Sequence, residues 1–388
     1  MSARRRADTI VVGLGAMGSA LCFQLAARGV SVIGVDQYHP PHVYGSTHGE
    51  TRITRLAIGE GPEYVPLVRR SHDLWRQIEQ QAGVRLLTRS GGLVLAHADS
   101  PFLIQTRASA GQFGIVHENL ATAEVVRRFP MFSVDQCTEA YYEPEAGYVC
   151  PEAAVRAQLT LARRHGAQVR LGEHVEEWSA SAGRVVVRTD AETYEAEQLV
   201  LCAGAWIPQL FPEGSDIFAI HRQLLYWFPI RHGYEQLRDM PTFIWDLGGQ
   251  THGFVHLLGF YGFPAVGGSD GGVKVAAESY ERTTMPDGRQ PPATGAEIEE
   301  MYDRYISPHL PWLGAEPVRT SSCLYTSTRG SRFVIDRHPE HDAVFVVSPC
   351  SGHGFKHSPA IGEAVAQWVT GQASDIDLTG FALAQARR

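Results

Sequence analysis

The sequence predicts an α/β fold with two domains, and two stretches of the chain support this prediction. Residues 8–36 read in order as a strand, a glycine-rich turn, a helix and a second strand. Residues 217–313 are rich in aromatic residues and alternate between glycine and proline breaks, which favours an antiparallel sheet with one covered face. At 388 residues the chain is too long for one ordinary core, so about two domains are expected.

The N-terminal unit carries a dinucleotide-binding pattern. A β-branched strand leads into Gly13, Gly15 and Gly18, and a helix over 17–27 follows. The first glycine permits a tight turn, the second lets the backbone approach a pyrophosphate, and the third lets helix and strand pack closely. Asp36 ends the second strand, where a carboxylate accepts hydrogen bonds from an adenosine ribose. An ordinary glycine turn is the alternative, but the complete unit around the motif favours a Rossmann-like dinucleotide site.

The composition limits the kinds of partner. A formal net charge of −8 argues against nucleic acid or an anionic membrane. The apolar runs are shorter than the roughly 18 residues of a membrane-spanning helix, and no signal-peptide pattern is found. The six cysteines lack paired spacing, which indicates reduced thiols and neither a disulfide framework nor a metal site. We therefore expect a cytoplasmic protein.

Further elements follow from local patterns. Segment 37–55 contains a Pro-Pro pair and a Gly-Ser-Thr run, so it is expected to be irregular. Segment 64–81 places apolar residues at helical spacing and predicts an amphipathic helix. Residues 86–96 favour a pair of strands around two glycines. Other helices are expected at 100–113, 121–129, 151–165 and 359–369, and other strands at 168–171, 185–187, 199–202 and 344–347.

Two loops carry candidate site residues. In the irregular segment Arg52 and Arg55 are three residues apart, so on a helix they would share a face and reach one anionic group. A solvated basic patch is the alternative. After the strand at 344–347, Gly352 and Gly354 let backbone N–H groups approach a ligand such as a flavin, next to a helix N-terminus. Lys356 in this loop is either a partner for a substrate carboxylate or a surface lysine.

Several motifs together resemble the monomeric sarcosine oxidase and N-methyltryptophan oxidase family. The resemblance runs in order over nearly the whole chain, from Thr9 to about Phe381. The matching motifs are Pro40-Pro41-His42, Gly45-Ser46, His48-Gly49-Glu50-Thr51-Arg52, Gly59-Glu60-Gly61, Tyr64-Val65-Pro66, Cys323-Leu324-Tyr325-Thr326, Phe333-Val334-Ile335-Asp336, His338-Pro339-Glu340-His341 and Ser351-Gly352-His353-Gly354-Phe355-Lys356. The resemblance implies that the N-terminal pattern binds FAD, and that NAD is not the cofactor.

The resemblance further implies that FAD is held covalently. Cys323 matches the cysteine that forms a thioether to the flavin 8-methyl group, whereas a free cysteine is otherwise expected as a small core residue. His48 and Arg52 match residues that line the flavin. Lys274 matches the lysine placed where oxygen is activated, and a cation there stabilises the anion that oxygen forms. Further cofactor contacts are expected at Ser46, Val175, Gly352, Gly354 and Lys356.

The same resemblance implies a substrate and a reaction. Arg55 and Lys356 match the pair that holds the substrate carboxylate, and Tyr261, Glu278 and Tyr325 are further expected substrate contacts. An N-methyl or cyclic secondary amino acid is oxidised to an imine, which water hydrolyses to an amine and an aldehyde, while O2 is reduced to H2O2. The implied catalytic residues are Lys274, Arg55, Lys356 and His48.

Three alternatives stay open. The first is a deglycating (fructosyl amino acid) oxidase or a biosynthetic imino-acid oxidase of the same fold. The second is a dehydrogenase that passes electrons to a quinone or a protein, which an oxygen-activating Lys274 disfavours. The third is a non-catalytic flavin- or NAD-binding module.

The chain departs from the family pattern in the substrate region. Glu278 stands where sarcosine oxidases tend to carry a histidine, Phe260 stands where they often carry a tyrosine, and 267–272 is longer and richer in glycine than expected. If Glu278 faces the substrate, it favours a cationic or hydrogen-bond-donating substrate over sarcosine.

We expect the FAD-binding domain to be discontinuous, over 1–86, 150–215 and 318–388. The substrate domain is expected over 87–149 and 216–317 and is built on the antiparallel sheet. The family resemblance suggests a monomer.

Overall fold

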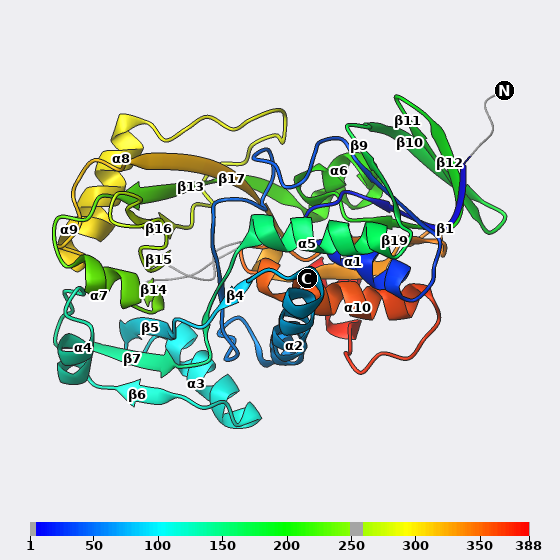
Figure 1. The fold of residues 1–388 in the computed structure, drawn as a ribbon. Helices are drawn as coiled ribbons and strands as arrows, with labels where there is room; N and C mark the ends of the chain where they lie inside the picture. The colour runs from blue at the N-terminus through cyan, green and yellow to red at the C-terminus, as the bar shows by residue number, and fades with distance from the viewer. Residues whose placement is uncertain (1–4, 249–258, 388) are drawn as a thin grey trace.

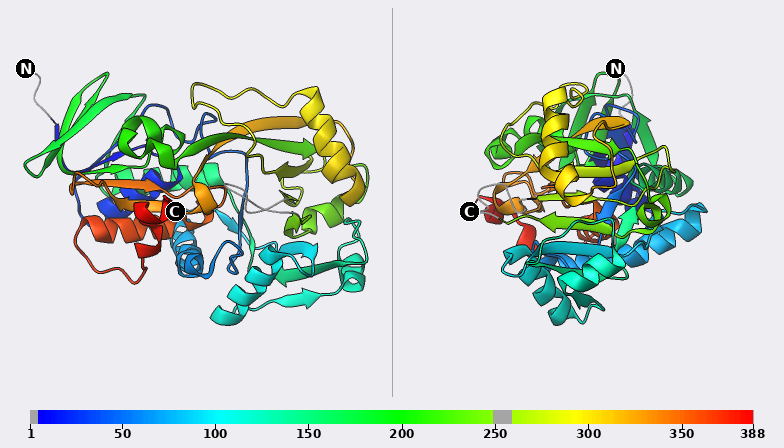
Figure 2. Two further views of the ribbon diagram at one scale, coloured as in Figure 1. Left: turned by 180° about the vertical axis from the view of Figure 1, so that it is seen from behind. Right: turned by 90° about the vertical axis from the view of Figure 1, so that its left-hand side faces the viewer.

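Two large sheets lie at opposite ends of the molecule (Figures 1 and 2). The structure is a computed structural model that describes residues 5–248 and 259–387. The predicted α/β class with a second, mainly antiparallel domain is confirmed. In the described part of the chain, no helix is both long and apolar enough to cross a membrane.

The first sheet has eight strands within the described residues and a parallel centre. Its path is β10-β11-β12-β1-β2-β9, and β19 pairs with β12 and β18. Because helices or loops cover both faces, its central strands are apolar on both sides, as Val11 faces one core cluster and Ile10 and Val12 the other. The strands are β1 (Arg5–Val12), β2 (Val32–Asp36), β9 (Gln168–Leu171), β10 (Val175–Ser181), β11 (Arg184–Thr189), β12 (Thr193–Leu201), β18 (Val334–Arg337) and β19 (Val344–Ser348). The sheet thus combines N-terminal, middle and C-terminal segments, as predicted.

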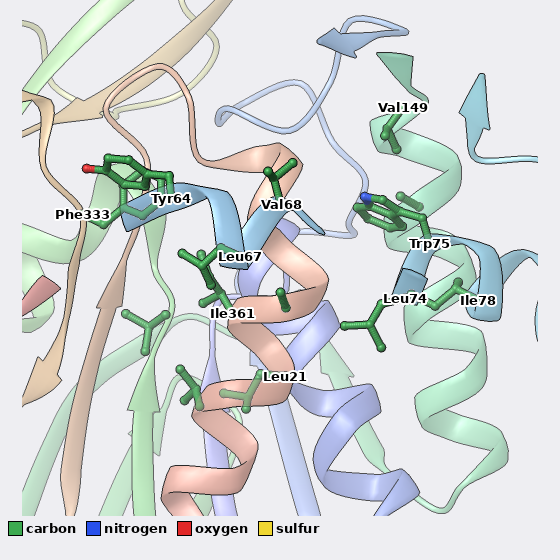
Figure 3. Packing of buried hydrophobic residues seen from close by; sticks show 14 of the residues in the cluster. Leu21, Tyr64, Leu67, Val68, Leu74, Trp75, Ile78, Val149, Phe333 and Ile361 are labelled. Carbon is green, nitrogen blue, oxygen red and sulfur yellow. The ribbon is translucent and has the colours of Figure 1, made fainter. Parts of the chain in front are cut away.

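Four helices pack together against this sheet. Figure 3 shows Leu67 beside Ile361, and Trp75 beside Val149, all within one buried cluster. A Cβ on Gly362 would lie 2.7 Å from the Ala20 Cβ, so the first and last of these helices approach each other closely. These helices are α1 (Ala16–Ala27), α2 (Val65–Ala82), α5 (Pro151–Arg164) and α10 (Ser358–Val369), and all four predicted helices are confirmed.

The second sheet also has eight strands within the described residues, in the order β17-β13-β16-β15-β14-β5-β7-β6. All its pairs are antiparallel except β14 with β5, which is parallel. Its strands are β5 (Gly92–His97), β6 (Glu118–Leu120), β7 (Thr138–Glu143), β13 (Ala219–Phe228), β14 (Thr242–Asp246), β15 (Gly259–Gly262), β16 (Val273–Ala277) and β17 (Arg319–Ser327). The remaining helices are α3 (Pro101–Phe113), α4 (Thr122–Arg128), α6 (Ile207–Leu210), α7 (Tyr234–Asp239), α8 (Gly295–Met301), α9 (Ser307–His309) and α11 (Leu383–Ala386).

Two local predictions are wrong. The strands expected as a pair within 86–96 belong to different sheets, because Gly91, at φ 78°, turns the chain between them. The first, β4 (Leu87–Thr88), joins β3 (Arg52–Thr54) and β8 (Gly147–Val149) in a small sheet, and the second is β5. Arg52 therefore begins a strand and does not share a helix face with Arg55.

The long antiparallel strands β13 and β17 span the distance between the second sheet and the first in Figure 1. Strand β17 carries Cys323 and is hydrogen-bonded into the second sheet, although its residues fall in the range 318–388 that we assign to FAD binding. The domain ranges stay a prediction.

Candidate active site

The glycine turn after β1 brings the backbone close together. Gly13 has φ 87°, and a Cβ there would lie 2.5 Å from the Cys202 carbonyl oxygen. A Cβ on Gly18 would lie 1.7 Å from the Gly13 carbonyl oxygen, so this residue allows α1 to pack on the strand. At Gly15, the nearest atom to a Cβ is Thr47 Oγ1 at 3.6 Å, so this glycine keeps the space before the helix open. The turn thus exposes backbone to a ligand beside a helix N-terminus.

Asp36 ties the end of β2 to this turn. Its carboxylate accepts hydrogen bonds from the backbone N–H of Leu14 at 2.7 Å and of Tyr38 at 2.8 Å. Burial raises the pKa of Asp36 to about 6, although both hydrogen bonds act in the opposite direction. The buried acceptor is therefore fixed at the edge of the glycine turn.

A cavity of about 340 Å³ extends from the glycine turn to the C-terminal loop. It is called the large cavity to distinguish it from the smaller one that adjoins it, while a separate cavity of about 890 Å³ lies beside the second sheet. Its walls combine the segments around β1, β2, β12 and β19 that the sequence associates with a dinucleotide. Eight predicted cofactor contacts line it: Gly13, Gly15, Asp36, Ser46, Arg52, Val175, Gly352 and Gly354. The open glycine turn, the helix N-terminus and the buried acceptor fit the pyrophosphate and ribose of a dinucleotide.

A second cavity of about 70 Å³, the small cavity, adjoins the large one. The two share Arg52, Tyr325, Gly352 and Phe355 as lining residues. The five predicted substrate contacts all line the small cavity, together with Glu60: Arg55, Tyr261, Glu278, Tyr325 and Lys356. The structure therefore brings together residues from the second sheet, from the segment at and after β3, and from the loop that follows β19.

Two buried cations meet at one side of the small cavity. Arg55 donates to a Glu60 carboxylate oxygen at 2.6 Å and to the Ala57 carbonyl at 2.6 Å. Lys356 donates to the His353 carbonyl at 2.7 Å, and its Nζ lies 3.8 Å from Glu60. Burial lowers the pKa of Lys356 to about 8. An arginine and a lysine that converge in a buried site can hold a carboxylate between them.

Hydroxyl and carboxylate groups also line the small cavity. The Tyr261 and Tyr325 hydroxyl oxygens lie 3.3 Å apart, and Tyr280 donates to Glu278 at 2.9 Å. A Cβ on Gly352 would lie 2.9 Å from a Glu278 carboxylate oxygen, so this carboxylate lies against the loop that both cavities share.

His48, Lys274 and Cys323 are not among the described residues that line the two cavities. Lys274 is 2% exposed and donates to the carbonyls of Gly49 at 2.6 Å and Thr51 at 2.8 Å. Burial raises the pKa of the Cys323 thiol, whereas the charges of Arg52 and Lys274 act to lower it. Arg52 and Lys274 are therefore within electrostatic reach of the Cys323 thiol.

His48 is also buried, at 3% exposed. Burial, followed by the charge of Arg52, lowers the pKa of His48 to about 4, so its imidazole is neutral at physiological pH. Its Nε2 has no hydrogen-bond partner within the described residues.

The sequence did not single out Glu60 as a site residue. Its signal was an acidic residue between two glycines, five positions after Arg55. The ion pair between Arg55 and Glu60 depends on the path of the loop that joins them, which the sequence pattern does not specify.

The chain is similar to flavin enzymes over nearly its whole length. A family model described as DAO, FAD dependent oxidoreductase, matches residues 8–368. Monomeric sarcosine oxidase from Streptomyces avermitilis is 39% identical over 376 residues, which cover 96% of this chain and 94% of that protein. N-methyl-L-tryptophan oxidase from Yersinia pestis is 32% identical over 386 residues, covering 98% and 99%.

The fold itself is shared with a more distant protein. NikD, an unusual amino acid oxidase essential for nikkomycin biosynthesis, superposes in its open form with a TM-score of 0.82, at 24% identity and 97% coverage of both chains. Together with the dinucleotide features of the large cavity, the family match and the two close relatives assign the cofactor. The chain belongs to the DAO family of FAD-dependent oxidoreductases and is an enzyme of the flavin-dependent amine oxidase type.

Proposed function

We propose that the protein oxidises the C–N bond of an N-methyl or cyclic secondary amino acid to an imine, with O2 as the electron acceptor. The observation that carries this proposal is the small cavity, where Arg55 and Lys356 converge on Glu60 beside the large cavity. The similarity to monomeric sarcosine oxidase and to N-methyl-L-tryptophan oxidase supports it.

The proposed oxidation step balances with the substrate and O2 alone. The CH–NH unit of the substrate loses two electrons and two protons, and O2 gains them to become H2O2. FAD, when bound in the large cavity, supplies the two-electron transfer that links these halves. Water then hydrolyses the imine to an amine and an aldehyde.

The side chains of the small cavity orient the substrate. Arg55 and Lys356 hold its carboxylate, which competes with Glu60 for both cations. Tyr261 and Tyr325 also bound the cavity. Both cations are themselves buried, which strengthens their attraction to a carboxylate.

Three residues near the cavities, of which Arg52 lines both, are proposed to act on the cofactor and on oxygen. We assign Lys274 to the electrostatic stabilisation of the anion that oxygen forms, and His48 and Arg52 to the flavin environment. The domain ranges given above, a monomeric state and a cytoplasmic location belong to the same proposal. The free thiols support the location, and the name of the sarcosine oxidase relatives supports the monomer.

A peroxide assay with the purified holoenzyme tests the proposed function. The panel consists of sarcosine, N-methyltryptophan, pipecolate, proline and a fructosyl amino acid. Peroxide formation with a secondary amino acid is the expected result. Preference for the fructosyl amino acid would support a deglycating oxidase instead, and quinone reduction without peroxide would support a dehydrogenase.

We propose that Cys323 forms the thioether to FAD. The Cys323→Ser variant is then expected to release its FAD on acid precipitation, leaving a colourless pellet, whereas the native pellet stays yellow. Cys350→Ser is the matched control, because Cys350 lines the large cavity and is half-buried. A native pellet without colour would exclude the covalent link.

Glu278 is proposed to select the substrate. In Glu278→Gln, the preference for an N-methyl amino acid with an amine in its side chain over sarcosine should fall by roughly tenfold, because a charged hydrogen bond is lost. The ratio of the two kcat/KM values measures this preference. Glu281→Gln, an exposed neighbour, is the control. An unchanged ratio in Glu278→Gln would show that this carboxylate does not determine the substrate preference.

A further inference from the structure

The loop 49–51 is held from two sides by oppositely charged side chains. Glu152 is the second residue of α5, and Lys274 is the second residue of β16. They are far apart in sequence and belong to different elements. Between them lies a segment of only three residues.

Glu152 binds the N–H groups of this loop. One of its carboxylate oxygens accepts from the Gly49 N–H at 2.6 Å and from the Glu50 N–H at 3.2 Å. A carboxylate early in a helix often serves only to interact with the helix dipole. Here its oxygen is engaged by a separate loop 102 and 103 positions away in the chain.

Lys274 binds the carbonyl groups of the same loop. Its Nζ donates to Gly49 O at 2.6 Å, to Thr51 O at 2.8 Å and to Thr51 Oγ1 at 3.2 Å. These three bonds use all the donors of an ammonium group. The direction of the lysine head is therefore set by the position of the loop.

The loop backbone needs such support. Gly49 has φ 95°, and Glu50, which has a side chain, has φ 71°. A non-glycine residue in this left-handed region costs free energy unless its surroundings hold it. The Glu50 carboxylate accepts from the Trp227 indole N–H at 2.8 Å and pairs with Arg319, which supports the same conformation from the second sheet.

Electrostatics links the same groups. Burial and then the charge of Arg52 lower the pKa of Lys274, whereas the charges of Glu152 and Glu50 act to raise it. Although burial opposes it, hydrogen bonds from the loop lower the pKa of Glu152, so this carboxylate is ionised. A fixed negative charge thus lies across the loop from the buried lysine.

We propose that Glu152 is a positioning residue for the oxidative half of the reaction, acting through loop 49–51 to hold Lys274 in place as a cation. The proposal rests on the proposed role of Lys274. It requires no contact between Glu152 and the substrate or FAD, and Glu152 lines neither cavity among the described residues.

Three variants of the holoenzyme test this proposal. Glu152→Ala removes the acceptor, Glu152→Gln keeps an acceptor oxygen without the charge, and Glu363→Ala is the matched control. Glu363 is a half-buried carboxylate on α10 that binds Arg70 at 2.6 and 2.7 Å, away from the loop. Two rates are measured by stopped flow, the anaerobic reduction by substrate and the reoxidation by O2. Hydrogen–deuterium exchange of the peptide containing 48–52 is measured separately.

In Glu152→Ala, reoxidation is expected to slow by roughly tenfold or more, because a charge-assisted bond is lost, while reduction is unchanged. Exchange in 48–52 accelerates. Glu152→Gln recovers part of both effects, and Glu363→Ala changes neither.

Equal slowing of both half-reactions, or faster exchange with unchanged reoxidation, would overturn the proposal, because Glu152 would then have only a structural role. If Glu152→Ala does not fold, the same comparison with Glu152→Gln decides. If reoxidation is unaffected in Lys274→Met itself, the proposed role of Lys274 fails, and this result is distinguishable from a failure of Glu152 alone.

Discussion

Replacement of Lys274 by methionine is expected to slow the reoxidation of the enzyme by oxygen by about 10²–10³-fold, the effect of removing one well-placed electrostatic group from a buried site. Lys274 is a buried lysine on β16, and a methionine of similar length carries no amine that could stabilise the anion formed from oxygen. Reduction by the substrate should be nearly unchanged, because the lysine does not line the small cavity.

Stopped-flow measurement of the two half-reactions separates these effects. Lys274→Arg is the informative control, since it keeps the charge and should recover part of the oxygen reaction. Both variants also lose hydrogen bonds to loop 49–51, so thermal stability must be measured beside the rates. A methionine variant that reoxidises at the native rate would remove Lys274 from the oxygen reaction.

The second large effect concerns the substrate carboxylate. Arg55→Gln or Lys356→Met is expected to raise KM for the amino acid by about 10²-fold, because each leaves a buried carboxylate short of a charged partner. Each single variant should raise KM nearly as much as the double variant does, since the two cations bind the same carboxylate. Steady-state kinetics with the best substrate of the panel measures the change.

The same pair predicts a pH dependence. Lys356 has a pKa lowered to about 8, so it is charged below this pH and loses its proton above it. KM should therefore rise as the pH increases through about 8, as the cation is lost. Lys356→Met should lack this rise. An identical pH profile of KM in the native enzyme and in Lys356→Met would assign the titration to another group.

Local patterns in the sequence predicted the glycine turn and the position of Asp36 beside it. Gly13, Gly15, Gly18 and Asp36 lie in one short βαβ unit, so their spacing alone specifies how they meet. The amphipathic pattern of α2 likewise predicts its helix from local sequence. By contrast, residues 86–96 were misread as a strand pair, because the strand partners lie far away in the chain.

The polar pairing within the site could not be predicted from local patterns. Glu60 binds Arg55 through a loop, and Glu152 reaches Gly49 across 103 positions. Such contacts depend on how several sheets meet, which no periodicity encodes. The sequence alone does not show whether Glu278 faces a cavity, and the structure places it on the wall of the small cavity.

The most direct test is the stoichiometry of the reaction catalysed by the native holoenzyme. With the best secondary amino acid, oxygen consumption, peroxide and the aldehyde released by imine hydrolysis are measured in one closed vessel. Equal amounts of all three are expected if the protein is an amine oxidase. Substrate oxidation that consumes no oxygen and yields no peroxide would contradict this function.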